Sequence, residues 1–579
     1  MRKEKMISFE KLEANVKTDW YKYYNNIAKH LEYPDISIYE MLERNSLKRL
    51  DLDAYNYFGS KGTYKDLLDL IESCSKSLKK IGVGKRDRIT VCMPNTPEAV
   101  ASFYAINKIG AVASMIHPLS AENEIKYYLN VAESKVLITI DLAWKKIKNI
   151  IDDTKVEKVI VLSVKESMPF FLKMGYSFTS GRKVEQPISS DKVVFWDQFI
   201  EYGKDYKKST KVNLRGKDEA VILYSGGTSG YPKGIMLSNL NFNALALQSI
   251  EACGCLREKD KVLSIMPIFH GFGLGICIHT VFNFGGCAVI LPQFSAKTFH
   301  KLLKKYKPNV IAGVPTLYEA LINNKKMQKM NLSYLKCVIS GGDSLSVSLK
   351  KKLDSFLKSH GADIQVREGY GLTECVTGSC LTPANYYKEG SIGIPYPDTY
   401  YKIVKPGTED ALGYNKDGEI VLSGPSVMIG YLKAREETNK TLRKHKDGLV
   451  WLHTGDLGCM DEEGFVYFKQ RIKRMIVSSG YNIYPQHIEN VIDSHPDVLM
   501  SCVIGIPHSY KMEVPKAFIV LKNGVEATDE LKEEIMNHCK KDLAKYSLPT
   551  EIEFRKTLPK TLVGKVAYTK LQKEELEKK

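Results

Sequence analysis

The sequence has 579 residues, of which 44% are hydrophobic and 26% charged, and its net charge is +17. A chain of this length exceeds a single hydrophobic core, so roughly three or four compact units are expected. The composition excludes a largely disordered chain. Because the basic residues are spread along the chain and accompany no nucleic-acid-binding motif, a solvated basic surface is favoured over nucleic-acid binding.

The distribution of apolar residues and cysteines favours a cytoplasmic protein with no integral membrane span. The 12 cysteines are scattered without metal-ligand spacing, and the first residues hold no apolar signal segment. Residues 262–296 carry no charged side chain, over a length that would suffice to cross a bilayer. Prolines, glycines and polar residues such as His270 interrupt this stretch, so a buried helix and strand are expected instead. Peripheral contact with a membrane stays open.

Two segments, 87–118 and 260–292, share one pattern. Each has an apolar run ending in Met-Pro, an apolar helix-length piece, a glycine and a second apolar run ending in proline. A helical piece and a third apolar run follow each time, at 121–131 and 135–140, and again at 296–306 and 309–312. This β-α-β-α-β order with continuous apolar strands predicts parallel sheets with helices on both faces.

The fold class is therefore α/β, with two doubly wound subdomains at residues 1–215 and 216–395. Short β-like runs between Gly, Pro and Asp predict a small β-rich subdomain at 396–470. A separate α+β domain is expected at 471–579, with strands near 498–505, 517–521 and 551–554 and a helix near 529–543. The less regular residues 164–187 are interpreted as a surface insertion.

The stretch LYSGGTSGYPKG, residues 223–234, is typical of a loop that binds an anion. An apolar strand precedes it, and a helix with Ser238 or Asn239 as N-cap follows it. Its glycines let backbone amides approach a phosphate, and its hydroxyls and lysine add donors and charge. It is not a Walker loop, because Pro232 and Gly234 flank the lysine. The expected phosphate contacts are Ser225, Gly226, Gly227, Thr228, Ser229, Gly230 and Lys233.

From Tyr224 to Gly234 the string resembles the phosphate loop of the adenylate-forming enzymes, which include acyl-CoA synthetases, luciferases and adenylation domains of peptide synthetases. Gly226 stands where serine is common in that family. Further motifs follow in the family's order over nearly the whole chain, most like those of bacterial fatty-acid and other acyl-CoA synthetases. The resemblance implies a large N-terminal domain, formed by the first three subdomains, and a mobile C-terminal domain.

The resemblance also implies the roles of residues in the middle of the chain. In MPIFHGFGL, His270 matches a histidine at the carboxylate pocket, and residues 266–274 lack the aspartate with which amino-acid-activating domains hold an amino group. In EGYGLTE, Tyr370 would stack on adenine, Thr373 would contact phosphate and Glu374 would hold Mg²⁺. The remaining nucleotide contacts implied here are Gly341, Gly342, Glu368, Gly369 and Gly371.

Motifs in the last part of the chain complete the resemblance. Asp456 in WLHTGD and Arg471 in RIKRMIV match residues that contact the ribose hydroxyls in the family. Lys473 matches the hinge residue. Gly480 falls in the loop that lines the thiol-acceptor channel, and Lys565 in PKTLVGK matches the catalytic lysine. The catalytic residues are thus expected to be Lys565, Lys233 and His270. Two departures from the family pattern are Asp343, in place of a smaller residue, and Arg474, in place of an acidic one.

The implied reaction has two steps. ATP with Mg²⁺ activates a lipophilic carboxylic acid, most simply a fatty acid, to an acyl-adenylate, and CoA then takes the acyl group. Two alternatives stay open: an acyl-adenylate ligase that loads a carrier protein, and a non-catalytic binder of nucleotides or acyl groups. Neither the acyl chain length nor the oligomeric state follows from the sequence.

Overall fold

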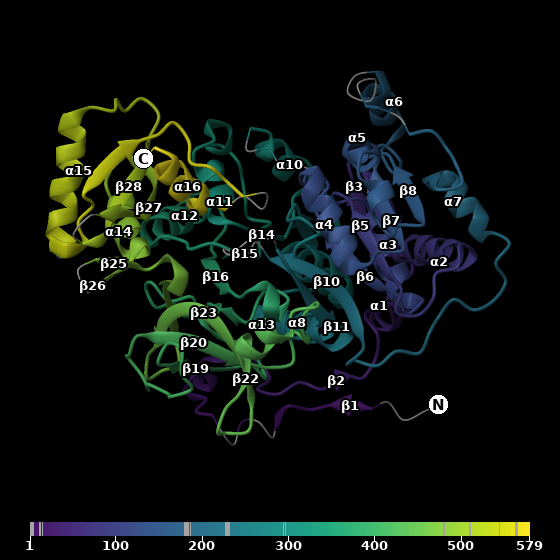
Figure 1. The fold of residues 1–579 in the computed structure, drawn as a ribbon, viewed down its shortest axis with the longest axis horizontal. Coiled ribbons are helices and arrows are strands. Elements are labelled where there is room, and N and C mark those ends of the chain that lie inside the picture. Colours follow the sequence, from purple (N-terminus) through teal and green to yellow (C-terminus); the bar gives the residue numbers. More distant parts are fainter. Residues whose placement is uncertain are drawn as a thin grey trace.

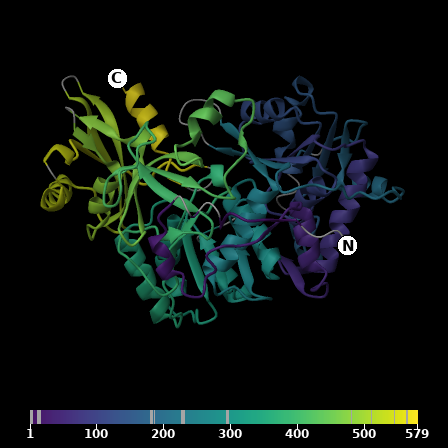
Figure 2. The same ribbon diagram turned by 90° about the horizontal axis from the view of Figure 1, so that it is seen from below.

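The computed structural model describes residues 5–578, except residues 11–12, 14–15, 179–183, 186, 226–231, 293–294, 296, 479–480, 509–510, 544 and 562–564. Two large mixed sheets, a small antiparallel sheet and a C-terminal unit make up the fold (Figure 1). In Figure 2 the C-terminal unit, in yellow, lies at one end of the molecule and the first large sheet, in blue, at the other.

The first large sheet has the strand order β21-β11-β10-β6-β5-β7-β8-β9. Its parallel part contains one of the two predicted β-α-β-α-β patterns, with β5 between the strands that follow it in sequence. α3 and α4 pack on β5 and β6, and α2 packs on α3 and α7. The bounds are β5 (Arg88–Cys92), β6 (Val112–Ile116), β7 (Val136–Ile140), β8 (Lys158–Leu162), β9 (Val193–Phe195), β10 (Glu219–Ser225), β11 (Lys233–Ser238), β21 (Gly430–Tyr431), α2 (Tyr64–Lys80), α3 (Pro97–Lys108), α4 (Glu122–Ala132) and α7 (Trp196–Gly203).

The second large sheet has the order β18-β17-β16-β15-β14-β12-β13-β3-β4 and contains the second pattern, with β12 again between its two followers. Its bounds are β3 (Asp53–Tyr57), β4 (Ser60–Thr63), β12 (Lys261–Ser264), β13 (Cys287–Ile290), β14 (Val310–Gly313), β15 (Cys337–Gly341), β16 (Val366–Tyr370), β17 (Cys380–Leu381) and β18 (Ile394–Pro395). The helices are α8 (Asn239–Cys253), the π-helix η6 (Phe272–Thr280), α9 (Val281–Phe284), α10 (Phe299–Tyr306), α11 (Pro315–Ile322) and α12 (Val347–Ser359).

The two sheets exchange strands across the expected boundary at residue 215. β3 and β4, from the first expected subdomain, pair into the second sheet, while β10 and β11, from the second, pair into the first. The division at 215 therefore does not separate the two sheets. Local periodicity predicts that a segment is a strand, but long-range packing decides which sheet the strand joins.

The phosphate-loop region contains a strand that the sequence did not predict. β11 begins at Lys233 and runs antiparallel to β10, with Lys233 opposite Ser225, so the loop connects a hairpin rather than a strand and a helix. The predicted N-cap of α8 is confirmed: the Ser238 hydroxyl accepts from the Asn241 amide at 3.2 Å, and the Asn241 side chain accepts from the Ser238 amide.

From Val262 to Leu291 the uncharged stretch is mostly buried, as predicted, and its helical part is the nine-residue π-helix η6 followed by α9. Among the described residues, none of the helices has the length and apolar composition needed to span a bilayer. In the expected insertion, α6 (Phe170–Phe178) lies on the surface after β8. The other described elements of the N-terminal part are β1 (Met6–Ile7), η2 (Asp19–Tyr23), β2 (Tyr33–Pro34), α1 (Ile38–Ser46), η3 (Asp141–Ala143), α5 (Trp144–Ile147), η4 (Ile151–Asp153), η7 (Lys325–Met327) and η8 (Thr373–Cys375).

The β-rich part and the C-terminal unit follow. The antiparallel sheet contains β19 (Tyr400–Val404), β20 (Gly418–Ser423), β22 (Leu442–Lys444), β23 (Val450–Met460) and β24 (Val466–Arg471), with α13 (Arg435–Thr441) beside it. The 3₁₀ turn η9 (Ile472–Arg474) leads to the C-terminal unit: β25 (Ile476–Ser478), β26 (Tyr481–Ile483), α14 (Pro485–Asp493), β27 (Val498–His508), β28 (Met512–Leu521), α15 (Asp529–Asp542), β29 (Glu551–Phe554) and α16 (Tyr568–Glu577). This unit has its own two hydrophobic clusters, separate from the main core, so it can move as a rigid body.

Candidate active site

A cavity of about 1360 Å³ lies where the carboxyl ends of the sheet strands face the β-rich sheet and the C-terminal unit. It brings together most of the residues singled out in the sequence, from stretches of the chain that lie far apart. They are Ser225, Lys233, His270, Gly341, Gly342, Glu368, Gly369, Tyr370, Gly371, Thr373, Glu374, Asp456, Arg471 and Lys565.

Some expected site residues fall outside the described part of the chain. These are Gly226, Gly227, Thr228, Ser229 and Gly230 of the phosphate loop, and Gly480 of the predicted acceptor channel. The backbone of Lys473 lies in η9, but its side chain is not described. The roles given to these residues stay predictions.

Glu374 and Lys233 meet at a tyrosine that the sequence did not single out. The Tyr431 hydroxyl donates to Glu374 Oε1 at 2.8 Å, and Lys233 Nζ lies 4.9 Å from the centre of the Tyr431 ring. Tyr431 reaches this place because β21 pairs with β11, which starts at Lys233. Tyr431 follows Glu374 by 57 residues, and the residues around it do not predict this contact.

The same place fits a magnesium ion. Mg²⁺ binds through one or two carboxylates together with phosphate oxygens. Glu374 supplies a carboxylate that lines the cavity, held in orientation by Tyr431, and the phosphate-loop strands end beside it at Ser225 and Lys233. Glu374 is therefore the residue that would hold the ion.

A carboxylate, a guanidinium and an aromatic ring form one wall of the cavity. Asp456 and Arg471 lie opposite each other on β23 and β24, with Arg471 Nε 3.4 Å from Asp456 Oδ1. The Tyr370 hydroxyl donates to Asp456 Oδ2 at 2.7 Å. Burial raises the pKa of Asp456, while Arg471 and Tyr370 act to lower it. This set of fixed polar groups beside a ring suits a nucleoside, with its hydroxyls on the carboxylate.

Two glycines are required by the backbone around the cavity, for different reasons. A Cβ at Gly371 would lie 1.4 Å from the carbonyl oxygen of Thr377, so no side chain fits between β16 and the following loop. Gly342 has φ +81°, a conformation that side chains other than glycine rarely adopt. A Cβ at Gly342 would lie 3.6 Å from Cε of Lys565, so the C-terminal lysine lies beside the end of β15.

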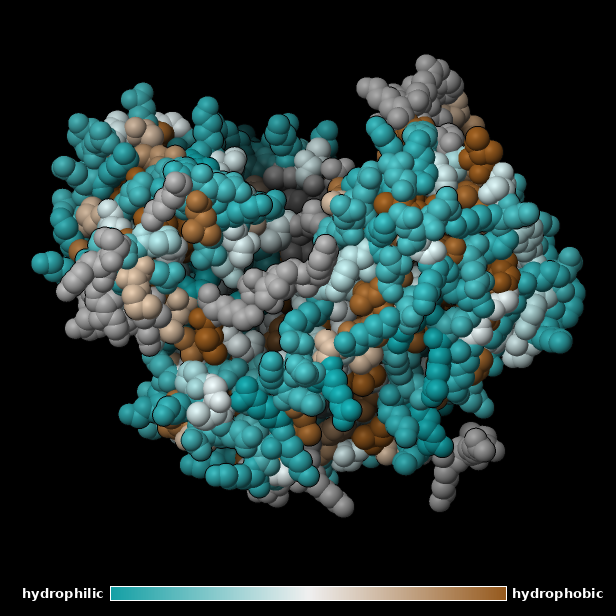
Figure 3. All heavy atoms as spheres, in the orientation of Figure 1, coloured by the Kyte–Doolittle hydropathy of each residue, from teal (hydrophilic) through white to brown (hydrophobic). Residues whose placement is uncertain are grey.

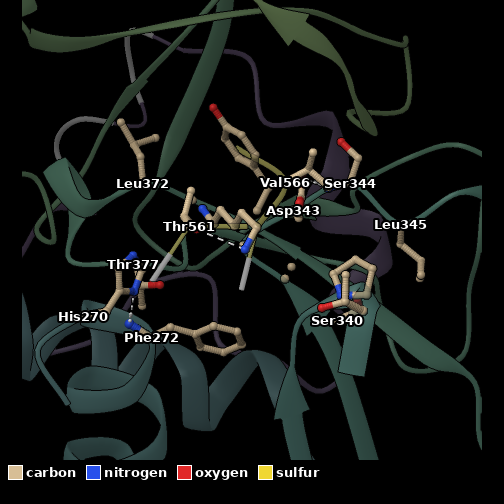
Figure 4. Close-up of a pocket in the computed structure, with 18 of the residues that line it drawn as sticks. His270, Phe272, Ser340, Asp343, Ser344, Leu345, Leu372, Thr377, Thr561 and Val566 are labelled. Carbon is tan, nitrogen blue, oxygen red and sulfur yellow. Dashed lines mark hydrogen bonds between the residues drawn. The ribbon is translucent and has the colours of Figure 1, made fainter. Parts of the chain in front are cut away.

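His270 is neutral and presents a hydrogen-bond donor. It stands at the start of η6, and its Nδ1 accepts from the Phe272 amide at 3.1 Å (Figure 4). Burial, with the nearby charge of Lys565, lowers the pKa of His270 to about 3. Since Nδ1 accepts, the single proton of the neutral ring is on Nε2, where it can be donated to a carboxylate.

Lys565 reaches the cavity from the C-terminal unit. Thr561 and Val566, on either side of it, project into the same space as His270 and Asp343 (Figure 4). The Lys565 amide donates to the Thr561 hydroxyl at 3.1 Å, and its carbonyl accepts from the Thr561 amide at 2.7 Å. Burial lowers the pKa of Lys565, and the Asp343 carboxylate opposes that shift. The C-terminal unit is therefore closed over the cavity with its lysine inside.

Arg474, which also departs from the family pattern, connects three elements of the C-terminal unit through its side chain. It forms an ion pair with Glu489 of α14 and donates to the Val503 carbonyl of β27 at 3.2 Å. Its guanidinium lies 4.9 Å from the ring centre of Tyr568 in α16. Because all three partners belong to the C-terminal unit, Arg474 is part of that unit.

From His270 the cavity continues inward between the second sheet and the helices α8 and η6. It reaches Val262, the second residue of β12, and Val310, the first residue of β14. Its walls there are uncharged. The lining residues are Val262, Val310, Ala312 and Ile339 from the sheet, and Ser249, Cys253, Ile276, Val281 and Phe284 from the helices.

Comparisons with known proteins identify the family of this chain. Residues 42–432 match the AMP-binding enzyme family, and residues 487–565 match the C-terminal domain of AMP-binding enzymes. A long-chain-fatty-acid–CoA ligase of Bacillus subtilis (strain 168) is 36% identical over 569 residues, covering 96% of this chain and 98% of the relative. A long-chain-fatty-acid–CoA ligase of Yersinia pestis is 30% identical, covering 93% of this chain and 94% of the relative.

A solved structure shows the same fold. The anthranilate CoA ligase AuaEII, crystallised with anthranoyl-AMP, superposes with a TM-score of 0.83 at 23% identity, covering 96% of this chain and 99% of the other. Both domains of the family are therefore present in the sequence, and the whole chain has the matching fold. The chain belongs to the family of AMP-binding, adenylate-forming enzymes.

Proposed function

We propose that this enzyme activates a fatty acid with ATP to an acyl-adenylate and pyrophosphate, and then transfers the acyl group to CoA with release of AMP. The observation that carries the proposal is the uncharged cavity arm. It begins at His270 and Lys565 and extends to Val262 of β12 and Val310 of β14, which suits an apolar chain with its carboxylate at the reacting end. The names of the bacterial relatives support the same substrate class.

In the first step a carboxylate oxygen attacks the α-phosphorus of ATP, and the bond to the pyrophosphate oxygen breaks. Two anions must meet, so fixed positive charges and donors do most of the work. Lys565 stands where it can bridge the carboxylate and the α-phosphate, and Lys233 beside the loop can hold the leaving phosphates. A magnesium ion on Glu374 would neutralise charge on the phosphate oxygens.

His270 would orient the acid. Its protonated Nε2 can donate to one carboxylate oxygen, and its low pKa keeps it from taking up a second proton at neutral pH. A neutral hydrogen-bond donor can orient the carboxylate. It lowers the nucleophilicity of the carboxylate less than a cation would.

In the second step the CoA sulfur attacks the acyl carbon, and AMP leaves. Lys565 projects into the reacting end of the cavity in the closed arrangement, so the C-terminal unit is expected to rotate and make room for the thiol. The pivot proposed is Arg471–Lys473, because Arg474 is tied into the moving unit.

The proposal is tested by pyrophosphate release from ATP across fatty, aromatic and amino acids, with and without CoA. Release with fatty acids together with formation of acyl-CoA is expected. Release without any thioester would indicate a carrier protein as acceptor, and no release with any acid would indicate a non-catalytic binder.

The inner end of the cavity is expected to set the longest acid accepted. Cys253, near that end, is buried and lines the wall. Replacing Cys253 with phenylalanine should lower kcat/KM for long fatty acids by about tenfold or more while sparing acids of roughly half the length, since a steric block acts only on chains that reach it. Cys539→Phe, in the core of the C-terminal unit, serves as the control for a general packing defect. Equal loss for short and long acids would contradict this placement.

Tyr431→Phe is expected to slow adenylation by up to about tenfold, because the net value of one such hydrogen bond is about 0.5–1.5 kcal/mol. The measurement is ATP–pyrophosphate exchange, with Tyr202→Phe on the exposed side of α7 as the matched control. Unchanged exchange would show that Glu374 needs no help from Tyr431.

We also propose a cytoplasmic location. All 12 cysteines are free thiols, which is typical of proteins in a reducing compartment.

A further inference from the structure

The strand that carries Asp456 into the cavity is interrupted by a bulge at that residue. Three residues of β23, Thr454 to Asp456, lie opposite the single residue Ile420 of β20, where the register of the two strands shifts. Gly455, in the middle of the three, has a left-handed φ of +70°. A bulge re-aims side chains but breaks the ladder of backbone hydrogen bonds. The buried amides of the bulge therefore need other partners.

Side chains supply these partners. Glu419 Oε1 accepts from the Gly455 amide at 3.0 Å. The Thr454 hydroxyl donates to the Ile420 carbonyl at 2.6 Å and accepts from the Asp456 amide at 3.1 Å. The amide directly before Asp456 is thus held by a carboxylate that belongs to the neighbouring strand.

Two histidines hold the other oxygen of Glu419. Burial acts to raise the pKa of Glu419, but His453 and the Gly455 amide lower it on balance, so the carboxylate is ionised and only accepts. His453 therefore donates from Nδ1 to Glu419 Oε2, at 3.0 Å. Nε2 of His453 lies 2.9 Å from Nε2 of His445, so one of these rings donates and the other accepts. The three buried side chains are called here the Glu419 chain.

The Glu419 chain does not itself reach a bound molecule. Figure 3 shows the surface hollowed between the C-terminal unit and the first large sheet, in the region of the active-site cavity. Thr454, Gly455 and Asp456 line this cavity, and the described side chains of the Glu419 chain do not. The chain can therefore act on a ligand only through the bulge.

The bulge decides where Asp456 presents its carboxylate. Oδ2 of Asp456 accepts from the Tyr370 hydroxyl at 2.7 Å. Oδ1 is buried and accepts no hydrogen bond from any described residue, although Arg471 Nε lies 3.4 Å away as its ion-pair partner. Because buried carboxylate oxygens are normally hydrogen-bonded, this oxygen beside the cavity suits a hydroxyl donor of the ligand.

We propose that Glu419, held by His453 and His445, is a positioning residue that fixes the bulge at 454–456 and so aims Asp456 at the ribose hydroxyls of ATP. The inference rests on the proposed function, in which Asp456 receives the ribose. Loss of the Glu419 carboxylate would leave the Gly455 amide buried without its partner, and the bulge would shift to find another. The affinity that the ribose hydroxyls contribute should then be lost, while the contacts of the phosphates stay.

Calorimetry of nucleotide binding tests this, with ATP and with dideoxy-ATP, which lacks both ribose hydroxyls. The unaltered protein is expected to bind ATP more tightly than dideoxy-ATP. Glu419→Leu should bind ATP about tenfold more weakly or less and should bind dideoxy-ATP as the unaltered protein does. Glu419→Gln should recover most of the affinity, because its amide can accept from Gly455 and donate to neutral His453. The control is Glu409→Leu, at an exposed carboxylate between β19 and β20.

A second variant acts at the other end of the carboxylate. His453→Phe keeps the ring but removes the donor to Glu419, so it should weaken ATP binding with the same selectivity. Equal weakening for both nucleotides would overturn the proposal, because it would indicate a general packing defect. Unchanged ATP binding in Glu419→Leu and His453→Phe, or equal binding of the two nucleotides by the unaltered protein, would overturn it as well. Binding is measured without acid or CoA, so selective binding without pyrophosphate release would contradict only the proposed ligase activity.

Discussion

Replacing Lys565 with alanine is expected to slow acyl-adenylate formation by about 100- to 1000-fold, the usual cost of removing one fixed charge from a transition state. Thioester formation from supplied acyl-adenylate should be largely spared. The reason is geometric: Lys565 lies in the cavity beside Gly342 and His270 only in the closed arrangement that the first step uses. The two half-reactions are measured separately, by pyrophosphate release and by thioester formation with CoA.

Lys556→Ala is the matched control, since Lys556 is exposed on the same unit and its replacement removes the same charge. Equal loss of both half-reactions in Lys565→Ala would contradict the assignment, because it would indicate damage to the whole site. Near-normal adenylation would contradict it as well.

The unaltered enzyme should show the titration of this lysine in its first step. Burial lowers the pKa of Lys565, and the protonated form supplies the charge. Adenylation is therefore expected to fall as the pH rises through that lowered pKa, at a pH below the one at which an exposed lysine would titrate. Thioester formation from supplied acyl-adenylate should lack this fall.

Site residues could be predicted from the sequence where they stand in a short motif of consecutive residues. Asp456 and Lys565 stand in such motifs, and the structure brings both to the cavity. Their roles follow from resemblance and from the geometry, and the half-reaction measurements test them. Lys565 lies far from His270 in sequence, and only the closure of a separate unit brings them together.

Contacts across the chain could not be predicted in this way. The bond from Tyr431 to Glu374 depends on β21 pairing with β11, a strand that was itself missed because its short apolar run directly follows the loop and precedes a well-capped helix. The exchange of β3 and β10 between sheets has the same origin. The π-helical form of η6 could not be predicted either. Helical periodicity is recognised from the alternation of apolar and polar residues, and this run has no charged residues to mark a polar face.

The second large effect is expected at Glu374. Glu374→Gln should slow adenylation by about 100-fold or more, because a neutral amide binds Mg²⁺ poorly and the phosphate charge would then lack the ion that balances it. The substitution keeps an oxygen that can accept from Tyr431, so the fold around η8 should survive. The direct readout is calorimetry of ATP binding as a function of Mg²⁺ concentration, in which the variant should require more Mg²⁺ for the same affinity.

Glu436→Gln provides the control, because Glu436 is an exposed carboxylate on α13 and loses the same charge. An unchanged Mg²⁺ requirement would exclude Glu374 as the ion's ligand even if the rate fell. Thioester formation from supplied acyl-adenylate should persist, since no pyrophosphate leaves in that step. Both Glu374→Gln and Lys565→Ala are expected to lose the first half-reaction and keep the second. That result would place the two residues on opposite sides of the α-phosphorus, with Glu374 at the leaving phosphates and Lys565 at the incoming carboxylate.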